Sequence, residues 1–224
     1  MSRCLIFANG HLPDLQEAHR LVGSEDVVIA ANGGTRHALA LGLIPSVIIG
    51  DLDSIADELQ TLQAGGAQVF QHPRDKNETD LELALTYALE QGQTEIVILG
   101  ALGGRLDQTL GNLALLADPR LSGREVRLDD GVEEVFLCRA HARVQGRSGD
   151  LVSLIPWGGE VHGVRTEGLR WPLFDEPLFA HKTRGLSNEM TAEQALIWVR
   201  SGTLLVVHRR SSSAFENPPK GEQP

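Results

Sequence analysis

Residues 46–54 read SVIIGDLDS, a short apolar run followed at once by a glycine and two aspartates. An apolar run of four or five residues without alternation is typical of a strand that is buried on both faces, as in a parallel sheet. Comparable runs occur in the first half at residues 3–8, 27–31, 67–71 and 95–99. These runs predict the strands of one sheet.

Amphipathic stretches lie between the predicted strands. Apolar side chains recur at helical spacing in residues 79–91 and again in residues 107–117. Thr79, with Glu82 three residues later, forms a capping box at the start of the first of these helices. Strands that alternate with helices indicate an α/β domain whose mostly parallel sheet is doubly wound.

The second half has a different pattern. Short strand-like runs separated by glycine-rich or charged turns replace the helical pattern, and they predict a small antiparallel sandwich or barrel. The runs are residues 124–128, 134–139, 142–145, 151–156, 161–167, 195–200 and 203–208. We therefore expect an α/β domain over residues 1–122, an all-β sandwich- or barrel-like domain over residues 123–208, and a disordered tail over residues 209–224.

Composition excludes several classes of protein. The 224 residues carry a formal net charge of −10, which disfavours a broad nucleic-acid surface. No apolar run approaches the roughly 18 residues of a membrane span, and the apolar N-terminal run is too short for a secretory signal. Cys4 and Cys138 lie too far apart for a metal-finger spacing and are expected to be free thiols. We expect a cytoplasmic protein.

Unusual polar residues follow the predicted strands. In an open parallel sheet, ligands bind beyond the carboxyl ends of the strands, so these loops are expected to share one edge. They are NGG at residues 32–34, GDLDS at residues 50–54, RDKNETD at residues 74–80 and GALGGRLDQ at residues 100–108.

The carboxylates in these loops admit two interpretations. Asp51 and Asp53, one residue apart in an extended segment, can point the same way and supply hard oxygen ligands to Mg²⁺. They could equally be turn residues that precede a helix. Asp80 is either a further ligand or simply an acidic residue in the first turn of a helix, where negative charge is favourable. Asp107 is likewise a plausible helix cap.

The glycine loop is more specific. Gly100, Gly103 and Gly104, between a strand and a helix, allow the backbone to approach a phosphate near a helix N-terminus. Arg105 adds a bidentate phosphate donor, and Lys76 adds a point charge from a neighbouring loop. An edge that mixes acidic and basic groups fits a metal–nucleotide complex better than it fits turns alone.

In order, these motifs resemble those of the thiamine pyrophosphokinase family. The second half continues the resemblance with TEGLRWPL at residues 166–173 and GLSNE at residues 185–189, so that it extends over residues 3–208. It implies an ATP-binding catalytic α/β domain, a thiamine-binding β domain, and a homodimer with active sites at the subunit interface.

The resemblance also implies roles for individual residues. Asp51, Asp53 and Asp80 would hold Mg²⁺ and, with Arg105, form the catalytic set. ATP would be bound by Asn32, Gly33, Gly34, Lys76, Thr79, Arg105, Asp107 and Gln108, and thiamine by Trp171, Ser187 and Asn188. An indole can stack on the aminopyrimidine and attract the cationic thiazolium of thiamine, although core packing would also explain Trp171. The expected reaction is attack of the thiamine hydroxyl on the β-phosphorus of ATP with loss of AMP, and Asp80 is a candidate acceptor of the hydroxyl proton.

Asn32 departs from the family pattern, which usually has an aspartate before the two glycines. Asparagine keeps the shape and an acceptor oxygen but loses the charge. Two alternatives therefore stay open beside thiamine diphosphokinase activity: a diphosphokinase for another alcohol such as a pterin, and a sensor that binds thiamine or a nucleotide without efficient turnover. A third alternative, a metal phosphohydrolase, rests on the superficial resemblance of Asp51-Leu52-Asp53 to the aspartyl-phosphate enzymes. The position of the aspartate pair after the third predicted strand counts against the phosphohydrolase.

Overall fold

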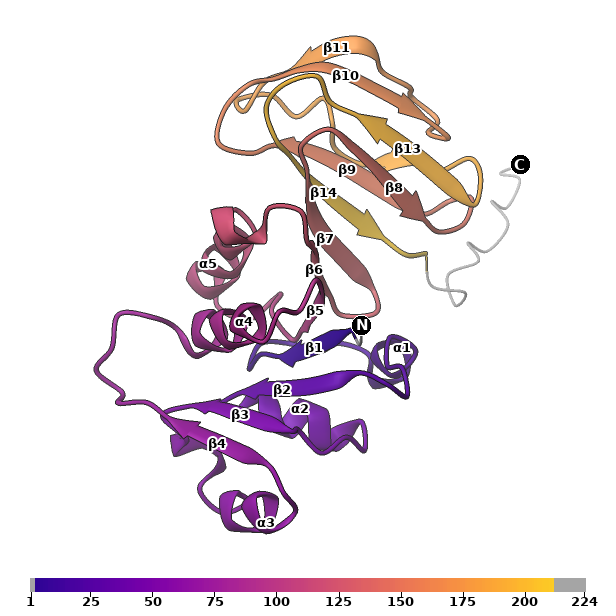
Figure 1. Ribbon diagram of the computed structural model, residues 1–224. Coiled ribbons are helices and arrows are strands. Elements are labelled where there is room, and N and C mark those ends of the chain that lie inside the picture. The colour runs from indigo at the N-terminus through magenta and orange to yellow at the C-terminus, as the bar shows by residue number, and fades with distance from the viewer. Residues whose placement is uncertain (1–2, 212–224) are drawn as a thin grey trace, which may run out of the picture. The chain divides into compact units, whose positions relative to one another are not determined.

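The computed structural model describes residues 3–211 and contains two compact units (Figure 1). The first unit comprises Met1–Leu137 and the second Cys138–Pro224. This division lies later in the chain than the one expected between residues 122 and 123. The reason is that residues 125–137 extend the sheet of the first unit.

The first unit is built on a sheet with the strand order β7-β6-β5-β1-β2-β3-β4. Strands β1 to β6 pair in parallel, and β7 pairs antiparallel with β6. The bounds are β1 Cys4–Phe7, β2 Val27–Ala31, β3 Val47–Gly50, β4 Gln68–Gln71, β5 Glu95–Leu99, β6 Glu125–Asp129 and β7 Glu133–Cys138. The central strands β1, β2, β3 and β5 are almost wholly buried, as their uninterrupted apolar runs predict.

Helices cover both faces of this sheet. Leu5 and Phe7 of β1 pack in one apolar cluster with Ala18 of α1 and Ala38 of α2, whereas α4 packs against β1, β2 and β3 from the opposite face (Figure 1). The helices are α1 Leu15–His19, α2 Gly34–Ala40, α3 Leu59–Ala64, α4 Asp80–Glu90 and α5 Leu106–Leu115, with 3₁₀ turns at Asp53–Ile55 and Pro119–Leu121. The predicted doubly wound α/β architecture is confirmed.

Gly34 lets helix α2 begin directly against strand β1. A Cβ atom at this position would lie 2.0 Å from the carbonyl oxygen of Phe7. Because that neighbour is backbone, Gly34→Ala should lower the free energy of unfolding by about 2–3 kcal/mol in urea denaturation. Gly111→Ala in α5 is the matched control, since its Cβ would meet open space and the higher helix propensity of alanine should give a small gain. Equal stability of the Gly34→Ala variant and the wild type would contradict the packing argument.

The second unit contains two antiparallel sheets, with strand orders β12-β9-β14 and β11-β10-β13-β8. Most of these strands alternate between buried and more exposed residues, so each sheet buries one face, as in a sandwich. The bounds are β8 His141–Gln145, β9 Leu151–Pro156, β10 Val161–Glu167, β11 Phe174–Leu178, β12 Asn188–Glu189, β13 Gln194–Trp198 and β14 Leu204–Arg209. The expected antiparallel β fold is confirmed.

The end of the chain differs from the expected tail at its first residues. Arg209 still belongs to β14, and Ser211 donates hydrogen bonds to Asp150. The rest of the predicted disordered tail, residues 212–224, lies outside the described residues. Within residues 3–211, no helix is long and apolar enough to cross a membrane.

Candidate active site

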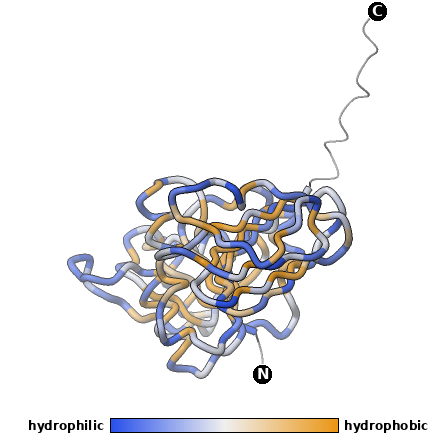
Figure 2. The backbone as a smooth tube through the Cα atoms, turned by 90° about the horizontal axis from the view of Figure 1, so that it is seen from above, coloured by the Kyte–Doolittle hydropathy of each residue, from blue (hydrophilic) through white to orange (hydrophobic). Residues whose placement is uncertain are grey.

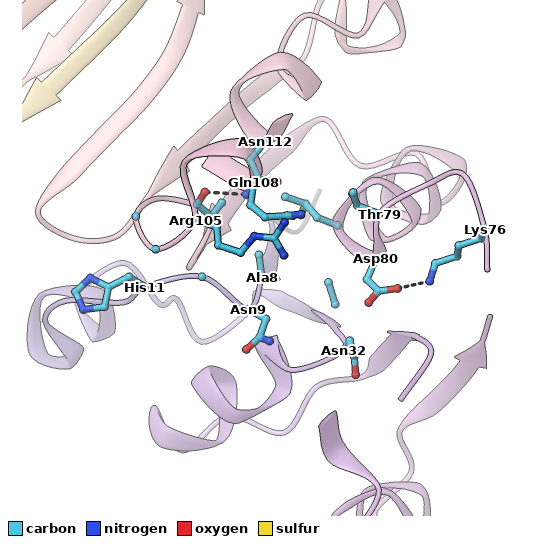
Figure 3. A pocket seen from close by; sticks show the side chains of 16 residues that line it. Ala8, Asn9, His11, Asn32, Lys76, Thr79, Asp80, Arg105, Gln108 and Asn112 are labelled. Atoms are coloured by element: carbon cyan, nitrogen blue, oxygen red, sulfur yellow. Dashed lines mark hydrogen bonds and ion pairs between the residues drawn. The ribbon is translucent and has the colours of Figure 1, made fainter. Parts of the chain in front are cut away.

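A cavity of about 640 Å³ opens at the carboxyl edge of the first unit's sheet (Figure 3). Its walls come from the loops after β1, β2, β4 and β5, as expected for an open parallel sheet. Six of the predicted site residues line it: Asn32, Lys76, Thr79, Asp80, Arg105 and Gln108. The cavity therefore brings together residues from three of the four loops that the sequence singled out.

The fourth loop, after β3, reaches the cavity through Asn32. The Nδ2 atom of Asn32 donates to Oδ1 of Asp51 at 2.7 Å and to Oδ1 of Asp53 at 3.2 Å. The pKa of Asp53 lies below its ordinary value, chiefly because of this bond from Asn32 and a second from Ser54. Asp51 and Asp53 thus face the same amide.

Asp80 and Asn32 both approach the end of β3 at Gly50. A Cβ at Gly50, the last residue of β3, would be 2.8 Å from Cβ of Asn32 and 3.0 Å from Cγ of Asp80. The absence of a side chain at Gly50 therefore lets these two residues close in on the strand end. Thr79 caps helix α4 by accepting from the amide of Glu82 at 3.2 Å, as the capping box predicts, and Asp80 is the first residue of that helix.

Lys76 is the basic partner of Asp80. Its Nζ atom lies 2.9 Å from Oδ1 of Asp80, and both side chains are largely buried. The loop that carries Lys76 joins β4 to α4 and is hydrophilic along its length (blue in Figure 2). The lysine therefore turns back from an exposed loop to place its charge beside a carboxylate at the cavity wall (Figure 3).

The loop between β5 and α5 forms the opposite wall. Gly100, Gly103 and Gly104 all have positive φ angles, which glycine alone adopts freely. Arg105 follows them and grips Asp107 with two hydrogen bonds, of 3.1 Å and 2.6 Å. The pairing raises the pKa of Arg105 and lowers that of Asp107. Asp107 lies in the first turn of α5 and not at its cap.

Two side chains of α5 hold the glycine loop in place. Asn112 donates from Nδ2 to the carbonyl oxygen of Ala101 at 2.8 Å, and Thr109 donates to that of Gly103 at 3.1 Å. Gln108 points into the cavity from the same helix (Figure 3). The loop and the helix N-terminus therefore form one wall whose backbone and side chains suit an anion.

Sequence reasoning missed the loop after β1. Asn9 and His11 line the cavity, and the loop continues the pairing of β1 with β5 through Gly10, whose amide donates to the carbonyl of Gly100 at 2.6 Å. Asn9 packs against Gly33, where a Cβ would lie 2.4 Å from its Cγ. The Asn-Gly pair directly after the first strand was the available signal, since that strand ends at the same edge. Asn112, the other missed polar residue, lies four positions after Gln108.

The predicted metal ligands do not form a single cluster. Across residues 3–211, no group of three or more His, Cys, Asp or Glu side chains is gathered as a ready metal site. The donor chemistry nevertheless fits Mg²⁺, which prefers a few carboxylates together with phosphate and water oxygens. Asn32 Oδ1 and Asp80 Oδ1 are buried oxygens without a hydrogen-bond donor of good geometry, and both side chains line the cavity. Assignment of Asp51, Asp53 and Asp80 to the metal stays a proposal.

The predicted thiamine residues lie together in the second unit. Asn188 bridges the backbone of Trp171, donating from Nδ2 to its carbonyl oxygen at 2.7 Å and accepting from its amide at 3.1 Å. The neighbouring Ser187 has a positive φ angle, and its amide donates to Ser153 Oγ. Trp171 is 57% exposed, which rules out core packing as its role in this chain. The guanidinium of Arg170 lies over its ring, 5.2 Å from the centroid.

The α/β unit has a cavity lined by a glycine loop, Arg105 and the start of a helix, which suits a phosphate-bearing ligand, and a β unit with an exposed tryptophan follows it. Two family models match this chain: "Thiamin pyrophosphokinase, catalytic domain" over residues 18–128 and "Thiamin pyrophosphokinase, vitamin B1 binding domain" over residues 141–205. The two matches leave the junction around residues 129–140 between them, where the structure also divides.

Individual relatives agree with the family models. Thiamine pyrophosphokinase of Bacillus subtilis (strain 168) is 29% identical over 182 residues, which are 80% of this chain and 85% of that protein. Thiamin pyrophosphokinase 1 of Caenorhabditis elegans is 36% identical over 181 residues, covering 72% and 68%. The crystal structure of the Bacillus subtilis enzyme superposes with a TM-score of 0.84 at 26% identity and covers 94% of this chain and all of that one. The chain belongs to the thiamin pyrophosphokinase family.

Proposed function

We propose that this protein is a thiamine diphosphokinase, which transfers the diphosphate of ATP to the hydroxyl of thiamine and releases AMP. The observation that carries the proposal is the composition of the cavity. Asp80 and Asn32, which is hydrogen-bonded to Asp51 and Asp53, line one side of the cavity, and a glycine loop, Arg105 and a helix N-terminus line the other. Such a combination suits a polyphosphate whose charge is neutralised from two directions.

The predicted metal and ATP residues each have a part in this reaction. When bound at Asp51, Asp53 and Asp80, Mg²⁺ would neutralise phosphate charge and orient the groups that react. Arg105 exchanges its partner Asp107 for a phosphate, and Lys76 adds a second positive charge close to Asp80. Thr79, Gln108 and the backbone at Gly103 and Gly104 donate to ATP. Asp107 then serves to hold Arg105 in place before ATP arrives.

The acceptor is assigned to the second unit. The exposed indole of Trp171 offers an aromatic surface for the aminopyrimidine and the cationic thiazolium. Asn188 holds the backbone of Trp171 at both its amide and its carbonyl, so that the indole is presented from a fixed loop. Ser187 supplies a further polar group beside it. The family model for vitamin B1 binding spans these three residues, which supports this assignment.

Product analysis tests the proposed function directly. Purified protein is incubated with ATP, Mg²⁺ and thiamine, and AMP and thiamine diphosphate are followed together by chromatography. Equal amounts of both products, formed only with Mg²⁺, are expected. Formation of AMP with a pterin alcohol but not with thiamine would reassign the acceptor. Binding of thiamine without either product would instead identify a sensor.

We propose further that the protein is a homodimer with active sites at the subunit interface, and helix α5 of the first unit supports this proposal. None of its residues is buried, and Leu106 and Leu110 are 72% and 51% exposed. The same helix carries Gln108 and Asn112 of the cavity. A second copy seated on this apolar face would cover it and complete the site.

Leu110→Glu is expected to weaken the dimer at least about tenfold, because burial of a charge without a partner is costly. Sedimentation equilibrium at micromolar concentrations measures the effect. Ile44→Glu is the matched control, since Ile44 is also an exposed apolar residue of the first unit but lies outside α5. A wild type that is monomeric, or a Leu110→Glu variant that dimerises as well as the wild type, would refute this interface.

We propose that the protein is cytoplasmic, and its use of ATP is compatible with that location. Cys4 and Cys138 are both free and buried, and burial raises the pKa of their thiols to about 12 and about 11. Neither thiol is therefore reactive at neutral pH, in keeping with a role in packing.

A further inference from the structure

Asn32 is a buried polar residue whose amide is shared between two carboxylates. It is only 8% exposed, and it lies directly after β2 with a φ of 43°, in the left-handed region that asparagine tolerates better than most residues. Its Nδ2 donates to Asp51 at 2.7 Å and to Asp53 at 3.2 Å. One amide group thus ties together two carboxylates that would otherwise repel each other.

The chemistry of the partners determines how the amide is oriented. Ionised carboxylates only accept hydrogen bonds, so the nitrogen of Asn32 must face Asp51 and Asp53. The oxygen then faces away from them. It is buried and has no hydrogen-bond partner, and Asn32 lines the cavity. An acceptor without a partner in such a position awaits a donor or a cation from a ligand.

An aspartate at this position would change the charge balance. It would place a third carboxylate within hydrogen-bond distance of Asp51, with no proton to share between them. Like charges so close repel strongly unless a cation lies among them. Asn32 avoids this repulsion, and the one remaining carboxylate of the site, Asp80, already has Lys76 as a counter-charge. A neutral amide thus joins Asp51 and Asp53 without cancelling their negative charge, which stays available to attract a cation.

We propose that Asn32 is a positioning residue that holds Asp51 and Asp53 in place before a divalent cation binds, and that its neutrality makes the binding of that cation weaker than a carboxylate would. The inference rests on the proposed function in one respect only, namely that the site takes a divalent cation. It deepens that function, because assembly of the site and loading of the cation become separate events in this chain.

Mn²⁺ binding to the metal-free protein, followed by electron paramagnetic resonance, tests the proposal together with thermal unfolding with and without Mg²⁺. Asn32→Asp is nearly isosteric and is expected to bind Mn²⁺ at least about tenfold more tightly than the wild type. Without metal it should unfold at a lower temperature, and Mg²⁺ should restore most of the loss. Asn32→Gly removes the amide without backbone strain and should bind Mn²⁺ more weakly than the wild type.

Asn9→Asp is the matched control for charge. It adds a carboxylate to the same cavity, but its side chain packs against Gly33, whereas Asn32 is the amide that bonds Asp51 and Asp53, so its effect on Mn²⁺ affinity should be smaller. Equal Mn²⁺ affinity in wild type and Asn32→Asp, or equal stability of the two without metal, would overturn the inference while leaving thiamine diphosphate formation untouched. Absence of Mn²⁺ binding in all four proteins would overturn the metal assignment as well.

Discussion

Asp53→Ala is expected to lower kcat for thiamine diphosphate formation by about 10²–10³-fold, the range seen when one charge-stabilising group is removed from an active site. Asp53 is exposed, and its carboxylate accepts hydrogen bonds from Asn32 and Ser54 without packing against the core. Its loss should therefore change the unfolding temperature little. Steady-state AMP formation at saturating Mg²⁺, together with calorimetry, measures both effects.

Asp57→Ala is the control for this experiment. Asp57 is another exposed carboxylate in the same segment, so the change in net charge is identical, but it does not bond to Asn32. Turnover of the Asp57→Ala variant should stay close to that of the wild type. Near-normal kcat in Asp53→Ala would remove Asp53 from the proposed metal site. A large fall of kcat in both variants would show that the total negative charge of this loop matters, and not Asp53 in particular.

The parallel part of the fold is accessible from the sequence because its strands are buried on both faces. Such strands are continuous apolar runs, and the predicted ranges 27–31 and 95–99 coincide with β2 and β5. Ligands of open parallel sheets bind beyond the carboxyl ends of the strands, so the loops that follow these strands could be placed together without knowledge of any contact. The start of helix α4 was also predictable, because Thr79 and Glu82 have the spacing of a capping box, and Thr79 accepts a hydrogen bond from the amide of Glu82.

Pairing partners are harder to predict than strands. Residues 125–129 form a strand near the predicted position, but nothing in their half-buried pattern says that they pair in parallel with β5 and belong to the first unit. β11 was not predicted, because its sequence FDEPL contains two acidic residues and a proline and is mostly exposed. Sheet-edge strands of this kind carry little hydrophobic signal.

The site shows the same limit. Motifs identified most of the cavity residues, yet the bonds from Asn32 to Asp51 and Asp53 join residues 19 and 21 positions apart and depend on the register of β2 and β3. Lys76 and Asp80 are only four positions apart, so their pairing is a local feature of the chain. The burial of both side chains depends on the rest of the fold. The motifs therefore predicted which chemical groups belong to the site. Only the folded structure shows which carboxylates share a hydrogen-bond donor and which has a positive counter-charge.

In the second unit, Asp150 and His208 form a pair that is almost completely buried, with 1% and 0% of the residues exposed. Oδ2 of Asp150 lies 2.9 Å from Nε2 of His208 and accepts from the amide of Arg147, while Oδ1 accepts from the amide and the hydroxyl of Ser211. One carboxylate thus ties the end of β14 to the turn that precedes β9. Gly146 makes room for it, since a Cβ there would lie 2.5 Å from Oδ2.

Asp150→Ala should lower the free energy of unfolding by about 3–5 kcal/mol at pH 7, because it leaves buried donors without their acceptor.

Burial alone would raise the pKa of Asp150, but the hydrogen bonds from Ser211, His208 and Arg147 outweigh it, so the pKa lies below its ordinary value. A carboxyl whose folded pKa is depressed contributes stability above its unfolded pKa, near 4, and loses that contribution as the pH falls through the folded value. The gap between wild type and variant, measured by urea denaturation, should therefore narrow in acid. Glu167→Ala, which breaks the exposed ion pair with Arg165, should cost less than about 1 kcal/mol. A gap that is equally small for Asp150→Ala at pH 7, or that widens as the pH falls, would show that the buried pair does not stabilise this unit.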